Sequence, residues 1–249
     1  MTGTASQWIV TGGASGIGAQ LVRELLEAGE TVVIWDLTAP SPANSATYLE
    51  VDLSQPGAVE AAAAQVDGPV RAFIHCAGVA APTSVADTNL ADQLRFAFEV
   101  HLVSFVVAVQ ALADQLEAGG GSVVAVVSIA MDVIAPATLA YGISKASLRR
   151  AIDQLAVELG GRGIRINGVA PGAIATPMTN EAWSNEDYAR ERRSFIPLGR
   201  QGQPVSVTSV IRFLASDSAN YITGTTIQVD GGMRHGIFNL AARGVAEPS

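Results

Sequence analysis

The chain has 249 residues, of which 49% are hydrophobic and 15% charged, and its formal net charge is −8. This length allows a sizeable core in one domain, and the negative charge argues against nucleic acid or an anionic membrane surface as a partner. Cys76 is the only cysteine, which excludes an internal disulfide and fits the reducing cytoplasm.

Targeting and membrane signals are not evident in the sequence. Residues 1–7 lack the basic and then apolar pattern of a signal peptide. The apolar run at residues 96–112 is interrupted by Glu99, His101 and Gln110. We therefore expect no membrane span and a cytoplasmic protein.

A strand is predicted at residues 8–10, followed by a glycine-rich turn and a helix with a leucine face. Gly12 permits the tight turn, Gly16 lets the backbone approach a pyrophosphate, and Gly18 allows close helix packing. The spacing, G-x-x-x-G-x-G, differs from the common G-x-G-x-x-G. Because a helix N-terminus attracts anions, the segment predicts a dinucleotide phosphate site. Its expected members are Gly12, Ser15, Gly16, Ile17 and Gly18.

The second predicted strand, residues 31–36, ends in Asp36, which lies 18 residues after Gly18. An acid about 20 residues beyond the glycine turn typically binds a ribose 2′-hydroxyl. Leu37 follows, and neither Ala14 nor Ser15 is basic. The 2′-phosphate of NADP would lie next to the Asp36 carboxylate, and no arginine is evident to pair with it. The sequence therefore favours NAD over NADP.

Further strands are predicted at residues 48–51, 70–75, 122–127, 164–169 and 226–229, and helices at residues 55–66, 90–116 and 206–216. Pro40 and Pro42 exclude a regular helix from residues 38–46. The alternation predicts an α/β fold: a Rossmann-type doubly wound parallel sheet in a single domain spanning residues 1–249. Residues 176–200 are weakly periodic and are expected to form a lid over the substrate.

Lys145 is the only lysine among 15 basic side chains, and it lies four residues after Tyr141. On a helix these two side chains share one face. A free tyrosine has a pKa of about 10, and a neighbouring ammonium stabilises the phenolate. The pair therefore indicates proton transfer at an alcohol oxygen, with the pKa of Tyr141 lowered by Lys145. By itself, the pair is better explained as a surface pair on an amphipathic helix, and the rest of the chain reverses that preference.

Taken together, these features resemble the short-chain dehydrogenase/reductase family over residues 8–232. The shared motifs occur in order, and Ser128 stands at the family's usual interval of 13 residues before Tyr141. They are Thr11-Gly12, Gly16-Ile17-Gly18, Ala77-Gly78, Ser128, Tyr141 with Lys145, Pro171-Gly172 and Val229-Asp230-Gly231-Gly232.

This resemblance implies roles for the matched residues. Tyr141 would be the acid/base, Ser128 would hold the substrate oxygen, and Lys145 would bind the nicotinamide ribose. Asp52 is expected to accept from the adenine amino group. The expected cofactor-binding set is completed by Asp36, Leu37, Asp52, Leu53, Ala77, Gly78, Tyr141, Lys145, Pro171, Gly172, Ile174 and Thr176.

Two positions depart from the family pattern. His75 and Cys76 stand where the family has two asparagines, and His101 stands where it has the asparagine of a proton relay. A neutral imidazole both donates and accepts, so His101 is expected either to carry the relay as a catalytic residue or to be a packed helix histidine. The spacing of His75, Cys76 and His101 does not suggest a metal site.

The sequence thus predicts an NAD-dependent oxidoreductase that transfers a hydride between nicotinamide and a secondary alcohol or ketone. An apolar, cyclic or aromatic substrate is favoured by the residues expected to bind it: Ser128, Ile129, Met131, Val133, Leu139, Met178, Trp183 and Phe195. The alternatives are a 3-oxoacyl-(acyl carrier protein) reductase and a non-catalytic NAD(H)-sensing protein. The family implies a homo-oligomer, with a tetramer favoured over a dimer.

Overall fold

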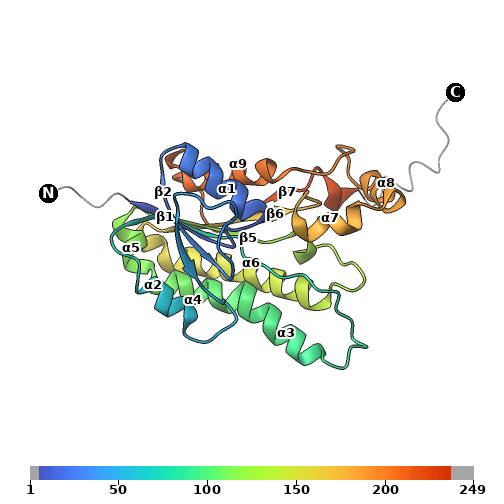
Figure 1. Cartoon of the computed structure of the whole chain (residues 1–249), viewed down its shortest axis with the longest axis horizontal. Helices are drawn as coiled ribbons and strands as arrows, with labels where there is room; N and C mark the ends of the chain where they lie inside the picture. The colour runs from blue at the N-terminus through green and yellow to red at the C-terminus, as the bar shows by residue number, and fades with distance from the viewer. Residues whose placement is uncertain (1–5, 237–249) are drawn as a thin grey trace.

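The computed structural model describes residues 6–236, except the side chains of Glu181 and Ala182. Seven parallel strands form one sheet in the order β3-β2-β1-β4-β5-β6-β7 (Figure 1). The strands are β1 (Gln7–Thr11), β2 (Thr31–Asp36), β3 (Thr47–Glu50), β4 (Val70–His75), β5 (Ser122–Val126), β6 (Arg165–Pro171) and β7 (Thr226–Val229). The predicted fold class is confirmed.

Helices cover both faces of this sheet (Figure 1). One face carries α1 (Gly16–Glu27) and α9 (Pro204–Ala215). The other carries α2 (Ala58–Ala63), α4 (Ser104–Ala111) and α6 (Leu139–Leu159). The remaining helices are α3 (Leu90–Phe98), α5 (Ala113–Ala118), α7 (Pro177–Trp183) and α8 (Glu186–Ser194).

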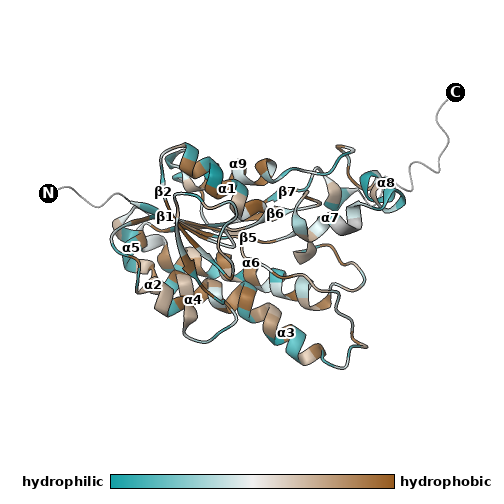
Figure 2. Ribbon diagram, viewed as in Figure 1, coloured by the Kyte–Doolittle hydropathy of each residue, from teal (hydrophilic) through white to brown (hydrophobic). Residues whose placement is uncertain are grey.

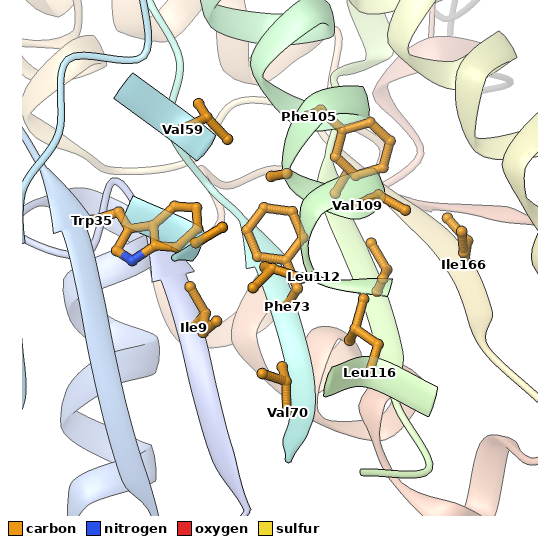
Figure 3. Close-up of a cluster of buried hydrophobic side chains, with 14 of the residues drawn as sticks. Ile9, Trp35, Val59, Val70, Phe73, Phe105, Val109, Leu112, Leu116 and Ile166 are labelled. Carbon is orange, nitrogen blue, oxygen red and sulfur yellow. The ribbon is translucent and has the colours of Figure 1, made fainter. Parts of the chain in front are cut away.

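Alternation along the strands explains why both faces are covered. In β1, Ile9 packs toward α4 and α6, while Trp8 and Val10 pack toward α1 and α9. Figure 3 shows Phe73 of β4 meeting Phe105 of α4, with ring centroids 6.4 Å apart. Fully burying such a side chain contributes roughly 1.5–3 kcal/mol. The strands are therefore apolar on both sides, as expected for a parallel sheet.

The strand order places a crevice at the centre of the sheet. β1 pairs with β2 on one side and with β4 on the other. The chain thus moves outward in opposite directions from β1 and β4, so their following loops separate. Ligands bind at this switch point, outside the carboxyl ends of the strands.

The predicted helix at residues 90–116 is not continuous. A π-helical turn, Glu99–Val103, separates α3 from α4, and Ser104 N–H donates to the Glu99 carbonyl five residues back. Such a turn holds one extra residue and often marks a functional site. Here it carries His101, which is fully buried. As predicted, residues 38–46 form no helix.

By length and composition alone, Leu90–Ala111 could cross a membrane, and within the described residues it alone meets that test. However, this segment contributes Phe105 and Val109 to the core (Figure 3). Its apolar residues are brown in Figure 2, as are those of the strands against which it packs. Its second part, α4, therefore packs as a core helix, while 39% of the apolar window as a whole is buried.

Candidate active site

A cavity of about 310 Å³ lies at the carboxyl ends of the strands. All seventeen residues expected to bind the dinucleotide line it, as do Ser128 and Met178. These residues come from seven separate segments of the chain that span more than 160 positions. The sheet topology brings these segments together at one cavity.

The glycine-rich turn packs too closely for side chains. Gly12 has φ +66°, and a Cβ there would lie 2.8 Å from the backbone of Ala77. A Cβ on Gly18 would lie 2.1 Å from the Gly12 carbonyl oxygen. The turn therefore holds the N-terminus of α1 against the end of β4. The first turn of α1 contains no acidic residue, so its N–H groups present positive potential to the cavity.

Asp36 lies at the end of β2 with both carboxylate oxygens turned toward backbone donors. Oδ2 accepts from Ala14 N at 2.9 Å, and Oδ1 accepts from Thr38 N at 3.2 Å. A carboxylate has further lone pairs, so these bonds fix Asp36 and leave capacity for ribose hydroxyls. Leu37 lines the cavity beside it, and no arginine does so among the described residues.

Asp52 also lines the cavity, and its carboxylate is held by hydrogen bonds. Its Oδ1 accepts from both the N–H and the hydroxyl of Ser54, at 2.9 and 2.7 Å. These bonds lower the pKa of the carboxyl.

Ser128, Tyr141 and Lys145 line the cavity together, and the Ser128 side chain hydrogen-bonds with Tyr141. Ser128 follows β5, and Tyr141 and Lys145 lie on the first turns of α6. Lys145 Nζ is 5.9 Å from the centre of the Tyr141 ring and donates to the Val126 carbonyl at 2.8 Å. The helical spacing of four residues thus places both groups on the cavity side, as predicted.

The ionisation of this site differs from the expectation. Burial raises the pKa of Tyr141, and hydrogen bonding with Ser128 only partly opposes that effect. Burial also lowers the pKa of Lys145 to about 7, since its side chain is 3% exposed and forms no salt bridge in the described structure. Without a bound cofactor, Tyr141 is therefore a neutral phenol and Lys145 is only partly charged near neutral pH.

His101 does not line the cavity, and its two ring nitrogens are occupied. Val79 N–H donates to Nε2 at 2.9 Å, so the ring proton resides on Nδ1. Nδ1 then donates to Ser144 Oγ at 2.8 Å, and that hydroxyl donates to the Tyr141 carbonyl. Burial lowers the pKa of His101 to about 2. These contacts describe a neutral clamp between the loop after β4 and helix α6, and they do not support a proton relay through its ring.

His75 and Cys76, the other departures from the family pattern, are also uncharged. His75 Nδ1 lies 3.0 Å from Thr11 Oγ1, and burial lowers its pKa to about 3. Burial raises the pKa of the Cys76 thiol to about 12, although nearby Lys145 acts in the opposite direction. Neither residue is part of a metal-binding group of side chains, and residues 6–236 contain none.

Six of the predicted substrate residues do not line the cavity: Ile129, Met131, Val133, Leu139, Trp183 and Phe195. Ile129 is buried, and Met131 packs against the core below the sheet. Trp183 stacks edge-on against Tyr188 of α8, with ring centroids 6.4 Å apart. Apolar character alone did not distinguish cavity residues from core residues.

Ten lining residues escaped prediction: Trp35, Val51, Cys76, Val79, Phe96, Val100, Val126, Val127, Pro177 and Thr179. Phe96 and Val100 are four residues apart, which shows that they share a helix face. That spacing does not show which face turns toward the cavity, since it depends on how α3 packs on α6.

A family model described as enoyl-(acyl carrier protein) reductase matches residues 12–234. The chain is 33% identical to 3-alpha-(or 20-beta)-hydroxysteroid dehydrogenase of Mycobacterium tuberculosis over 243 residues, which cover 92% of this chain and 89% of the relative. It is 27% identical to 2,5-dichloro-2,5-cyclohexadiene-1,4-diol dehydrogenase LinX of Sphingobium indicum, over 92% of this chain and 96% of the relative.

Solved structures agree with these relatives. The structure of 4-hydroxyisoleucine dehydrogenase complexed with NADH superposes with a TM-score of 0.85 at 28% identity. The match covers 92% of this chain and 98% of the other.

The buried Lys145 gives a testable dependence of stability on pH. Its pKa is lowered from 10.5 to about 7 in the folded chain, so between these values the unfolded chain binds more protons. The free energy of unfolding should then rise with pH across that window, on the order of 1 kcal/mol per pH unit. Thermal unfolding of the cofactor-free protein from pH 6.5 to 9.5 measures this rise. Lys145→Met should remove it, and parallel curves for the two proteins would contradict the assignment.

Proposed function

The chain belongs to the short-chain dehydrogenase/reductase family, and we propose that it is an NAD-dependent dehydrogenase that interconverts an apolar secondary alcohol and its ketone. The observation that supports this most directly is the proximity of Ser128, Tyr141 and Lys145 in the lining of the dinucleotide cavity. This arrangement places a proton donor and a hydrogen-bonding hydroxyl where a carbonyl oxygen can reach both.

The residues present fit a nicotinamide dinucleotide. The glycine-rich turn and the N-terminus of α1 suit a pyrophosphate, and Asp36 suits ribose hydroxyls. Lys145 would hold the second ribose, and Ile174 and Thr176 would hold the carboxamide, since all three line the cavity. A bound nicotinamide ring supplies the hydride acceptor or donor. The carboxylate of Asp36 and the absence of arginine from the described lining support NAD over NADP.

Tyr141 would transfer the proton. In ketone reduction, its neutral phenol donates a proton to the substrate oxygen while Ser128 orients that oxygen. In alcohol oxidation, the phenolate takes the hydroxyl proton as the carbon–hydrogen bond breaks. Because burial raises the pKa of Tyr141, forming the phenolate requires positive charge nearby, from protonated Lys145 and from the oxidised nicotinamide ring.

The substrate would be apolar and cyclic. Val79, Phe96, Val100 and Met178 are apolar residues of the lining. The charged residues of the described lining are Asp36, Asp52 and Lys145. Because Lys145 is assigned to the ribose, no further cation of this lining would pair with a substrate carboxylate or phosphate. The relatives named for a hydroxysteroid and a cyclohexadiene diol support a cyclic alcohol.

An acyl carrier protein reductase is the second candidate, because the family model carries that description. A net charge of −8 disfavours docking of an acidic carrier. A non-catalytic sensing role would leave the meeting of Ser128 with Tyr141 unexplained.

We also propose that α7 and α8 act as a lid, since Pro177, Met178 and Thr179 line the cavity. We further propose that the protein is cytoplasmic.

Turnover should depend on the Tyr141 hydroxyl. We expect wild-type protein to reduce NAD with cyclic secondary alcohols, measured by nicotinamide absorbance, and Tyr141→Phe to lose activity by at least about 10³-fold while binding NADH nearly unchanged. Tyr221→Phe is the matched control, because Tyr221 is 99% exposed. Substantial turnover by Tyr141→Phe would mean that another group moves the proton. Turnover of an acyl carrier thioester but of no alcohol would favour the second candidate.

Cofactor choice should depend on the charge of Asp36. Asp36→Asn keeps the shape of the side chain but removes the repulsion of a 2′-phosphate, so the preference for NAD over NADP in kcat/KM should fall about tenfold or more. Asp87→Asn, on the surface loop after β4, serves as the control. An unchanged ratio would remove Asp36 from the ribose site.

We further propose a homo-oligomer, a tetramer or a dimer, built on the exposed apolar side chains of α3 and α6. Phe96, Ile143 and Val157 are 48%, 45% and 81% exposed, and α3 packs on α6. Light scattering should give a multiple of the 25.7 kDa chain mass. Val157→Glu should lower that mass, because it introduces charge into an apolar interface. A wild-type monomer would contradict the proposal.

A further inference from the structure

Helix α6, which carries Tyr141 and Lys145, does not cap its own N-terminus. Its N-cap residue is Thr138, which makes no side-chain capping hydrogen bond. The Thr138 hydroxyl donates instead to the Ala135 carbonyl at 2.7 Å. The first N–H groups of a helix have no partner within it, so a buried helix start needs acceptors from elsewhere.

Thr83, from the loop after β4, provides those acceptors. Its hydroxyl oxygen accepts from Ala140 N–H at 2.9 Å, and its carbonyl accepts from Leu139 N–H at 3.4 Å. Its own N–H donates to the Ala137 carbonyl at 3.0 Å. Thr83 is 3% exposed, and its three polar groups bind three residues at the start of α6: Ala137, Leu139 and Ala140. A residue 57 positions away performs the task of an N-cap.

The backbone before α6 is held in an unfavourable conformation by this contact. Ala137 has φ +57°, and it is the one non-glycine residue with positive φ in residues 6–236. For a residue with a Cβ, this left-handed region is disfavoured. Such a conformation persists where the surroundings determine it. Here the bond from Thr83 N–H to the Ala137 carbonyl is the contact that holds it.

The loop that contains Thr83 is tied to α6 at its other end as well. Val79 N–H donates to His101, which donates to Ser144 of α6. The segment Val79–Thr83 therefore spans the first two turns of α6, and the residue before it, Gly78, lines the dinucleotide cavity. Tyr141 lies immediately after Ala140, whose N–H binds Thr83.

We propose that Thr83 is a positioning residue that caps α6 from outside and thereby fixes the Tyr141 phenol relative to Ser128. This inference rests on the proposed function, in which Tyr141 transfers the proton. Without the hydroxyl, the first turn of α6 loses an acceptor for a buried N–H group, and Tyr141 loses its fixed position. Because a small misplacement of a reacting group slows chemistry far more than binding, kcat should fall while the affinity for the dinucleotide stays the same.

Three variants test this role. Thr83→Val keeps the branched shape and removes the hydroxyl, whereas Thr83→Ser keeps the hydroxyl. Thr208→Val is the control: it removes a buried hydroxyl from α9, on the opposite face of the sheet, where the Thr208 hydroxyl donates to Glu24. For each we would measure kcat, KM for NAD, NADH binding by fluorescence, thermal unfolding, and amide hydrogen exchange of the peptide containing Leu139 and Ala140.

In Thr83→Val we expect kcat to fall about tenfold or more, with KM for NAD and NADH binding within about twofold of wild type, and faster exchange at Leu139 and Ala140. Thr83→Ser should retain most of kcat. Thr208→Val should unfold at a lower temperature with kcat unchanged, which separates a loss of stability from a loss of positioning.

The proposal is overturned if Thr83→Val keeps its kcat, if exchange at Leu139 and Ala140 does not change, or if Thr208→Val loses kcat to the same extent. A wild-type protein that turns over no substrate, combined with faster exchange in Thr83→Val, would confirm the cap and reject the proposed function instead.

Discussion

The site depends on one desolvated ammonium. Lys145 is 3% exposed, donates to the Val126 carbonyl and has no carboxylate partner in the described chain. A buried charge without a counterion is costly, so its pKa falls to about 7. The neighbouring groups are neutral: His75 and His101 have pKa values of about 3 and 2, and the Cys76 thiol has one of about 12. A ligand that brings hydroxyl acceptors or charge can therefore change the protonation state of Lys145.

Helix α6, which carries Tyr141 and Lys145, is held in place by segments distant in sequence. Thr83 caps its first turn, and His101 links its second turn to the loop beside the cavity. The π-helical turn explains how a histidine can occupy that position, because the extra residue places His101 in the interior, between Val79 and Ser144. A neutral imidazole has one donor and one acceptor nitrogen, so His101 forms this bridge without needing to ionise.

Family membership and geometry constrain the function to different degrees. The comparisons cover nearly the whole chain and give a nicotinamide-dependent oxidoreductase of the short-chain class. The cavity adds what a family name does not contain: a carboxylate at the end of β2, no arginine among the described lining residues, and apolar side chains from α3 and α7. Of these, Phe96 and Met178 are about half exposed, and a bound substrate would cover such apolar surface.

The sequence by itself determined the features that are local in the chain. Hydrophobic periodicity gave the order of strands and helices, the glycine turn gave a candidate phosphate site, and the spacing of Tyr141 and Lys145 gave their shared helix face, because each depends on residues a few positions apart. Only the tertiary structure decided which apolar residues line the cavity, that His101 is a neutral clamp, and that Thr83 caps α6. Those properties arise from contacts between segments 22 to 57 residues apart, and burial, which sets the pKa values of Tyr141 and Lys145, exists only once those segments have packed.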